Sequence, residues 1–425
     1  MKYISIIALI SAILFFGCGE QTLPTANDDD GSSRKISLYY PDPGTVVNDF
    51  RIYFDWGGRE ESNGYKIRVF KDGETIIDHV EYTSSFKTLE PVYQGEYSWT
   101  VGMRDTSGEW GNWSDTISFT LIQEPLALYA TLQMPGQSED VVRNDDIIYI
   151  ADNHAGVSVV DYSSGTMEYH GSYEIPTQDR TLALWVDAVN ENLWAAAYRS
   201  NPPVGLFELD DPLNPSYYTL SVWARRASDI EGFYRGDNVY IAVSDQDDGI
   251  YVFDVTNPSI VDGELFRISG NTYGVDVFDS LFFAMAGEIG VIIGDLSDPY
   301  DLDEISSIDT YGDARECAVD SAAQIAYIAD GIAGLTLIDF ANPESPEIIT
   351  NIDTQVGDAQ DVHIHGDRLY LCIGSKGVLV YDISNPRAPE SIQHIETMYA
   401  NGIFVDGDYL YIADRDWGII LVGEN

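Results

Sequence analysis

Hydrophobic and polar positions alternate in short runs along most of this chain. The segment Tyr327–Pro346 (YIADGIAGLTLIDFANPESP) shows the unit: an apolar run, a turn with glycine, a second apolar run and a corner with proline. Alternation with a period of two is typical of strands, and no window shows a sustained helical period of 3.6 residues. The pattern predicts an all-β protein.

Variants of this unit recur through the last three hundred residues. A glycine opens the second apolar run at intervals of 41 to 49 residues, at Gly156, Gly205, Gly249, Gly290, Gly334, Gly377 and Gly418. Five residues after each of the first six comes an acid: Asp161, Asp210, Asp254, Asp295, Asp339 and Asp382. A repeat of this length made only of strands indicates the four-stranded blades of a β-propeller.

The two ends of the repeat array predict how it closes. The last unit stops at Leu421-Val422-Gly423 and lacks its outer strand, while a spare strand, Ala127–Met134, precedes the first unit. This spare strand aligns with the outer strand of a complete unit, Glu347–Ile352. We therefore expect a seven-bladed β-propeller over residues 127–425, closed by the strand 127–134, which leaves no exposed sheet edge.

The amino-acid sequence of the unit resembles that of the LVIVD-repeat family of bacterial extracytoplasmic proteins. The matching residues are Tyr327–Asp330, Gly334–Asp339 and Asn342-Pro343, and Gly377–Pro386 repeats them closely. The second unit is the poorest copy, with an insertion at Arg199–Val204. The resemblance implies a propeller at the cell envelope and brings no agreed catalytic residues.

Residues 36–122 have a different pattern. Short alternating runs such as Tyr65–Val69 and Tyr97–Val101 are separated by turn-forming residues, which predicts a β-sandwich of about seven strands. The order of Trp56, these two runs and Trp110–Ser114 resembles fibronectin type III domains, within the immunoglobulin-like class. Such modules act as spacers or bind proteins.

The first residues predict the compartment. Ile4–Phe16 is an apolar run of 13 residues, which is too short to span a bilayer and suits a signal peptide. Gly17-Cys18 at its end resembles the bacterial lipoprotein signal, which implies cleavage after residue 17 and a lipid on Cys18; the alternative is an ordinary signal peptide with a chance cysteine. Residues 18–35 read as a flexible tether. We expect a lipid-anchored envelope protein, with Gly19 favouring the outer membrane or cell surface.

The net charge of the chain indicates which kinds of partner it can attract. The chain has 22 basic and 70 acidic residues, a net charge of −48, so it repels phosphate backbones and nucleic acid is not an expected partner. Such a surface is either simply well solvated or attractive to cations and basic partners. Cys317 and Cys372 lie inside strand-like runs of different units, which favours two buried thiols over a disulfide.

Candidate ligands lie where the innermost strand of each unit begins. The equivalent positions are Asp140, Ala183, Glu231, Gly274, Glu316, Asp361 and Gly402. The four acids among them would face the mouth of the channel, with Asp229 nearby. Clustered carboxylates could bind a hard cation such as Ca²⁺ or capture a basic group; the alternative is chance, in a chain rich in acids.

Three other patterns favour structural interpretations. The recurring Asp before each proline corner can accept hydrogen bonds from turn amides, a role needed in nearly every unit. Asp245–Gly249 lacks the spacing of a calcium loop and predicts an acidic hairpin turn. His363 and His365 share a strand face without a third ligand, which favours a channel-lining pair without metal.

The functional expectation is coarse. The sequence has no phosphate-binding glycine loop, nucleophile elbow or paired cysteine ligands. This favours a non-catalytic binding scaffold for protein or polysaccharide, or a plain structural spacer. The alternative is an extracytoplasmic propeller enzyme, cleaving carbohydrates or esters with the carboxylates at the channel mouth and with Ca²⁺.

Overall fold

The structure is a computed structural model that describes residues 35–59, 62–176, 180–199, 203–218, 220 and 222–424. Every regular element within these ranges is a β-strand, which confirms the all-β prediction. No helix in the described part is long and apolar enough to cross a membrane. The expected signal peptide, Cys18 and nearly all of the expected tether lie outside the described residues.

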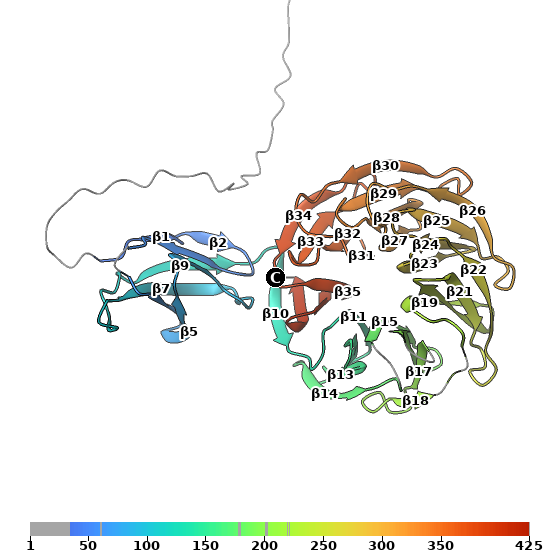
Figure 1. The fold of residues 1–425 in the computed structure, drawn as a ribbon, viewed down its shortest axis with the longest axis horizontal. Helices are drawn as coiled ribbons and strands as arrows, with labels where there is room; N and C mark the ends of the chain where they lie inside the picture. Colours follow the sequence, from blue (N-terminus) through green and yellow to red (C-terminus); the bar gives the residue numbers. More distant parts are fainter. Residues whose placement is uncertain are drawn as a thin grey trace, which may run out of the picture.

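The N-terminal module, residues 35–122, consists of two sheets (Figure 1, blue). One has the order β1-β3-β6, with strands Leu38–Tyr40, Tyr53–Trp56 and Ser85–Lys87. The other has the order β2-β9-β7-β4-β5, with strands Val46–Asn48, Ile117–Ile122, Gly95–Arg104, Tyr65–Lys71 and Glu74–Glu81, and β8 (Trp110–Gly111) beside β7.

The core of this module lies between its two sheets. Alternate residues of β4, such as Ile67 and Val69, are buried, as the period-two pattern predicts. They belong to one cluster with Phe54 and Trp56 of the first sheet and Trp99 of the second. The ring of Phe54 lies 4.9 Å from that of Trp99, so aromatic contacts join the sheets.

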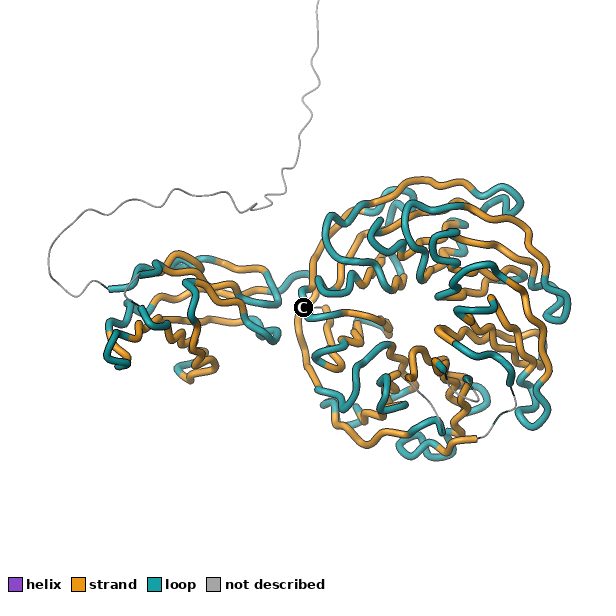
Figure 2. The backbone as a smooth tube through the Cα atoms, viewed as in Figure 1, coloured by secondary structure: helices purple, strands orange, loops and turns teal. Residues whose placement is uncertain are grey.

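The described residues from 126 to 424 form seven four-stranded sheets arranged around a common centre (Figures 1 and 2). Six of them use four consecutive strands. They are β11–β14 (Asp140–Asn144, Ile147–Ala151, Val157–Asp161, Glu168–Tyr173), β15–β18 (Arg180–Asp187, Asn192–Tyr198, Val204–Glu208, Ser216–Tyr218), β19–β22 (Ala227–Arg235, Asn238–Asp245, Gly249–Asp254, Asp262–Arg267), β23–β26 (Gly274–Phe278, Leu281–Met285, Val291–Asp295, Asp303–Ile308), β27–β30 (Glu316–Asp320, Ile325–Ala329, Leu335–Asp339, Glu347–Ile352) and β31–β34 (Asp361–His365, Arg368–Cys372, Val378–Asp382, Glu390–Ile395).

The seventh sheet joins the two ends of this part of the chain. Its order is β10-β37-β36-β35, with strands Leu126–Leu132, Gly418–Glu424, Tyr409–Asp414 and Ala400–Asp406. β10 pairs antiparallel with β37, from Leu126 opposite Glu424 to Leu132 opposite Ile419. The spare strand expected over 127–134 therefore does pair with the last strand, although it begins and ends earlier than expected.

The recurring glycine has a steric cause. Gly334 has a φ of +85°, and a Cβ there would lie 2.5 Å from the carbonyl oxygen of Ile352 on the outer strand. Gly377 has the same geometry, with a φ of +90° and 2.1 Å to the carbonyl of Ile395. Only glycine combines this conformation with so close an approach. Gly205, in the irregular second unit, lies inside β17 rather than before it.

Among the described residues, main-chain bridges link five pairs of neighbouring sheets at one face of the ring. We call this face, where the innermost strands begin, the entry face. Isolated bridges join Gly331 to Ala359 and Gly374 to Ala400, each pair connecting a hairpin to the start of the following innermost strand. The hydroxyl of Tyr327 donates a hydrogen bond to the main-chain carbonyl of Pro386 at 2.9 Å. This tyrosine of one sheet therefore also contacts the proline-containing turn of the next sheet.

The recurring acids before the corners cap their own turns. The carboxylates of Asp161, Asp254 and Asp382 each accept a hydrogen bond from the main-chain N–H two residues on, at 2.8, 3.0 and 2.8 Å. Asp295 and Asp339 make the same contact. The structural interpretation of these acids is confirmed at five of the six positions.

The N-terminal module is docked against the seventh sheet. Phe50, 1% exposed, packs into the same cluster as Leu128 and Trp417. The Arg51 guanidinium lies 5.8 Å from the Trp417 ring, and Lys87 pairs with Glu396. The contact combines a buried aromatic anchor with charged residues around it, as stable interfaces do.

Candidate functional site

The innermost strands of all seven sheets enclose a central cavity of about 730 Å³. The four acids expected at the channel mouth, Asp140, Glu231, Glu316 and Asp361, all line it. They come from β11, β19, β27 and β31, so the structure brings together residues from four separate units.

Three further carboxylates line the same cavity, Glu139, Asp229 and Asp276. Asp229 lies two residues before Glu231 on β19, and the structure includes it in the ring of acids. Asp276 lies two residues after Gly274 on β23 and was missed because only the first position of each strand was compared. The signal was available, since residues two apart on a strand point to the same side.

Most of these carboxylates bind main-chain N–H groups of the next sheet. Asp140 Oδ2 accepts from Leu184 N at 2.8 Å, Asp229 Oδ2 from Val275 N at 2.8 Å, and Asp361 Oδ2 from Ile403 N at 2.7 Å. In each case the donor directly follows one of the equivalent positions compared in the sequence, which are Ala183, Gly274 and Gly402. These carboxylates thus join adjacent sheets across the channel wall.

The same acids also bind within their own strands. Asp140 Oδ1 accepts from Val141 N at 2.7 Å and Asp276 Oδ1 from Val277 N at 2.7 Å. Glu316 Oε1 accepts from Cys317 N at 2.9 Å. Much of the hydrogen-bonding capacity of these carboxylates is therefore used by the fold.

Enclosure in the cavity makes these acids hard to ionise. Burial raises the pKa of Asp229 to about 6, and raises the pKa of Asp276 and of Asp361 to about 7 in each case, against the opposing effect of their main-chain donors. Burial, followed by the neighbouring carboxylates, raises the pKa of Asp140 and of Glu231 well above the usual range. The ring consequently retains protons that exposed carboxylates would lose.

Two members of the ring interact directly. The carboxyl groups of Asp229 and Glu316 influence each other, and the pKa of Glu316 is raised well above its usual range by burial and then by the charge of Asp229. Such a pair holds one proton between two carboxyl groups. Glu231 differs from the others, since no hydrogen bond of its side chain is seen among the described residues.

The carboxylates do not form a metal site in the described part of the chain. No group of three His, Cys, Asp or Glu side chains there is placed to hold a metal ion. The acids point to main-chain donors around the wall rather than to one centre, which is a poor fit to the six to eight oxygen ligands of Ca²⁺. The alternative of a Ca²⁺ site at the channel mouth therefore has no support from this geometry.

The histidine pair is divided between two environments. His363 lines the cavity, and burial, followed by His365, lowers the pKa of His363 to about 4. His365 is exposed. Only His363 of the expected channel-lining pair therefore lines the cavity.

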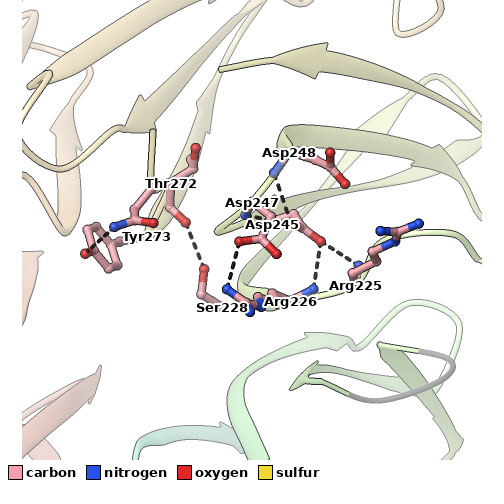
Figure 3. Close-up of polar contacts among 9 residues, drawn as sticks. Arg225, Arg226, Ser228, Asp245, Asp247, Asp248, Thr272 and Tyr273 are labelled. Atoms are coloured by element: carbon pink, nitrogen blue, oxygen red, sulfur yellow. Dashed lines mark hydrogen bonds and ion pairs between the residues drawn. The ribbon is translucent and has the colours of Figure 1, made fainter. Parts of the chain in front are cut away.

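The Asp245–Gly249 segment is a hairpin built around one buried carboxylate (Figure 3). Asp245 accepts from the main-chain N–H groups of Asp247 and Asp248, at 3.0 and 3.2 Å, and of Arg225 and Arg226, at 2.6 and 2.8 Å. Its carboxylate is thus occupied by four donors. The prediction of an acidic hairpin turn in place of a calcium loop is confirmed.

The two cysteines in the described region, Cys317 and Cys372, are buried and unpaired, as expected. Burial raises the pKa of both thiols well above the usual value. Cys317 Sγ lies 3.7 Å from Asp276 Oδ2. Both shifts favour the protonated thiol, which is a weaker nucleophile than the thiolate.

Comparison with known proteins agrees with this architecture. Five segments match the model of the LVIVD repeat: residues 135–167, 225–261, 312–354, 356–397 and 399–422. No curated protein matches the chain. The irregular second sheet lies in an unmatched gap, and so does the fourth sheet, whose strand order is nevertheless regular.

Solved structures share the fold at low sequence identity. The chain is similar to the WD40 β-propeller domain of Doa1 (TM-score 0.57, 11% identity, 71% of this chain and 98% of that one). It is also similar to U3-55K (TM-score 0.56, 12% identity, 70% and 98%) and to a chain of the Mitotic Checkpoint Complex (0.56, 12%, 70% and 91%). At this identity the likeness concerns the fold alone. The chain therefore carries LVIVD repeats and folds as a repeat β-propeller.

Proposed function

We propose that this chain is a lipid-anchored protein of the bacterial cell envelope that acts as a non-catalytic interaction scaffold. In this proposal Cys18 carries the lipid, residues 18–35 form the tether, and the N-terminal module is a fibronectin type III-like sandwich over 36–122. Each of the seven four-stranded sheets is one blade of a propeller over 127–425. The propeller binds protein or polysaccharide at or beyond the outer membrane.

The observation that carries the proposal is the use of the channel carboxylates in the wall itself. Asp140, Asp229 and Asp361 each bind an N–H of the adjoining sheet. A carboxylate whose oxygens accept main-chain hydrogen bonds is not free to attack a substrate. The central cavity is therefore better explained as part of a rigid ring than as a reaction centre.

The anchor is supported by the apolar run Ile4–Phe16 followed by Gly17-Cys18 and a polar segment. Metabolic labelling with a clickable fatty acid tests it: the wild-type chain takes up label, and Cys18→Ser does not. Label on the Cys18→Ser chain, or none on the wild type, would contradict the anchor.

The binding role needs a separate test. The full chain in non-ionic detergent, immobilised and exposed to solubilised envelope, is expected to retain a defined protein or polysaccharide. A variant lacking the lipid is expected to retain the same molecule, because the binding surface is the folded part. Retention of nothing by either chain would contradict the scaffold function.

A second candidate is a carbohydrate- or ester-cleaving enzyme, and the Asp229–Glu316 pair favours it. Two interacting carboxyl groups with raised pKa values are a known arrangement for acid–base chemistry. Screening of glycosides and esters with the wild-type chain and with Glu316→Gln separates the two functions. Turnover that Glu316→Gln abolishes would establish the enzyme.

A further inference from the structure

The central cavity has an excess of acidic groups that its own cations do not balance. Seven carboxyl groups line it, together with two arginines, Arg143 and Arg315. Arg143 pairs with Asp406 and Arg315 pairs with Asp358, and neither of these acids lines the cavity. Low-dielectric walls of one sign of charge concentrate the electrostatic field between them. The cavity therefore favours a positively charged occupant over a neutral or an anionic one.

Glu231 is a lining acid that the fold does not use. Within the described part of the chain, the other six lining acids each accept a hydrogen bond, and Glu231 accepts none. Its side chain is partly buried, protein surrounds its carboxyl group, and the nearest charges are those of Asp276, Asp229 and Asp140. An enclosed acid among other acids lowers the stability of the fold, so its presence requires another explanation. A ligand with a positive charge would supply the missing partner.

The wall becomes mostly apolar further from the entry face. Residues two positions beyond the first channel position of an innermost strand lie on the same side of that strand. We call those that line the cavity the second layer; they are Val142, Trp185, Asp276, Ala318, His363 and Phe404. Burial lowers the pKa of His363 to about 4, so this ring is neutral at pH 7. Asp276 is thus the one acid of a layer that otherwise offers aliphatic and aromatic surface.

Trp185 joins this apolar surface to Glu231. A Cβ on Gly232, the residue after Glu231, would lie 2.1 Å from Cε2 and 2.2 Å from both Cδ2 and Cζ2 of the indole. These nearly equal distances show that the ring lies with its face against the β19 backbone, where only glycine leaves room for it. Aromatic rings also attract ammonium groups. Trp185 therefore places an apolar, cation-compatible surface beside the unpartnered carboxylate.

We propose that the central cavity binds a small organic amine, with one ammonium group donating to Glu231 and an apolar carbon skeleton against the second layer. A volume of about 730 Å³ is in the range of small-molecule sites. One unpartnered carboxylate matches one positive charge. A metal ion would need several ligands directed at one point, which the described residues do not provide. This inference goes beyond the scaffold function and does not depend on it.

The test is calorimetric titration of the full chain, in non-ionic detergent, with n-butylamine at about pH 7.5, where alkylamines are protonated. Three related compounds separate the contributions: 1-butanol lacks the charge, methylamine lacks the carbon chain, and 1,4-diaminobutane adds a second charge. Glu231→Gln is the test variant. Glu347→Gln, the same change at an exposed position of the outer strand β30, is the matched control.

We expect n-butylamine to bind the wild-type chain and Glu347→Gln equally. Glu231→Gln should bind it at least about tenfold more weakly, because hydrogen bonds to charged groups are worth at least that factor. 1-Butanol should not bind, and methylamine and 1,4-diaminobutane should bind more weakly than n-butylamine. Absence of n-butylamine binding to the wild type, or equal binding to Glu231→Gln, would overturn the proposal. So would equal or tighter binding of methylamine or of 1,4-diaminobutane.

A second variant keeps every carboxyl group and changes the second layer. Phe404→Ala removes a ring that lines the cavity beside His363, 6.4 Å between ring centroids. It should weaken the binding of n-butylamine and leave that of methylamine unchanged, because only the longer amine reaches the second layer. An equal effect on both amines would show that the carbon skeleton does not lie there.

The titration contains no envelope component, so its result is independent of partner capture. Failure of capture together with Glu231-dependent binding of n-butylamine would refute the envelope scaffold and leave the amine site standing. Successful capture by a chain that does not bind n-butylamine would refute the amine site and leave the scaffold standing.

Discussion

Asp140 on β11 accepts a hydrogen bond of 2.8 Å from the main-chain N–H of Leu184, which lies in the next sheet of the ring. The same relationship joins Asp229 to Val275 and Asp361 to Ile403. Apolar side chains fill most of the space between neighbouring sheets. The hydrogen bonds of these acids fix the position of one innermost strand against the next. The channel acids are thus a means of setting the geometry of the ring.

Removing this contact should destabilise the propeller. In Asp140→Ala the N–H groups of Leu184 and Val141 lose their acceptor, which costs about 1–3 kcal/mol for a buried unsatisfied group. Glu231→Gln is the matched control in the same cavity, because its side chain has no hydrogen-bond partner in the described region. Glu231→Gln removes a carboxyl group whose ionisation is unfavourable in the folded state, so it should raise the free energy of unfolding at pH 7.5. Urea denaturation of both variants measures the difference, and an equal loss in both would contradict the assignment.

The raised pKa values predict an unusual pH profile. Asp276 and Asp361 titrate at about 7 in the folded chain, while an unfolded Asp titrates near 3.9. Between these values the folded state binds more protons, so the free energy of unfolding must fall as the pH rises from about 4 to about 7. Turn-capping acids such as Asp161 and Asp382 have lowered pKa values and lose their contribution only at more acidic pH.

Thermal denaturation at constant ionic strength checks this profile. The Tm should be higher at pH 5 than at pH 7.5, and Asp276→Asn should show a smaller difference. A Tm that rises steadily from pH 5 to pH 7.5 in the wild-type chain would show that the channel acids do not retain protons.

The recurring glycine should be intolerant of even one methyl group. Gly334→Ala places a Cβ 2.5 Å from the carbonyl oxygen of Ile352, whereas Gly366→Ala meets no atom within 4 Å. Both positions have positive φ, so both variants pay about 1–2 kcal/mol for the left-handed conformation. Only Gly334→Ala also displaces the outer strand. Chemical denaturation should therefore show a clearly larger loss for Gly334→Ala, and equal losses would refute the steric explanation.

Phe50 should hold the N-terminal module against the propeller. Its ring is buried in a cluster with Leu128 and Trp417, and Phe→Ala at such sites costs about 3–5 kcal/mol. Phe50→Ala should release the module, which small-angle scattering would detect as a larger radius of gyration. Tyr82→Ala, at a residue 75% exposed on the same module, is the control and should leave the radius unchanged. An unchanged radius in Phe50→Ala would show that the contact is not what holds the two parts together.

Features that repeat along the chain could be predicted from the sequence, and single contacts between distant residues could not. The glycine before each strand, the turn-capping acids and the pairing of the spare strand followed from comparing units with one another. Four channel acids also followed from that comparison. Asp276 did not, because it lies two residues after Gly274, which is the position that was compared. The docking of Phe50 and the hydrogen bonds from the channel acids to the next sheet have no local signal. They depend on where the finished sheets bring residues that are far apart in sequence.

The scaffold account is tested most directly by comparing what the chain retains with what it converts. The full chain and Asp229→Asn/Glu316→Gln are each immobilised and exposed to solubilised envelope, and the bound material is identified and checked for chemical change. The account predicts that both chains retain the same protein or polysaccharide in equal amounts and leave it chemically intact. Retention of nothing by the wild-type chain, or cleavage of bound material that the double variant does not perform, would contradict it.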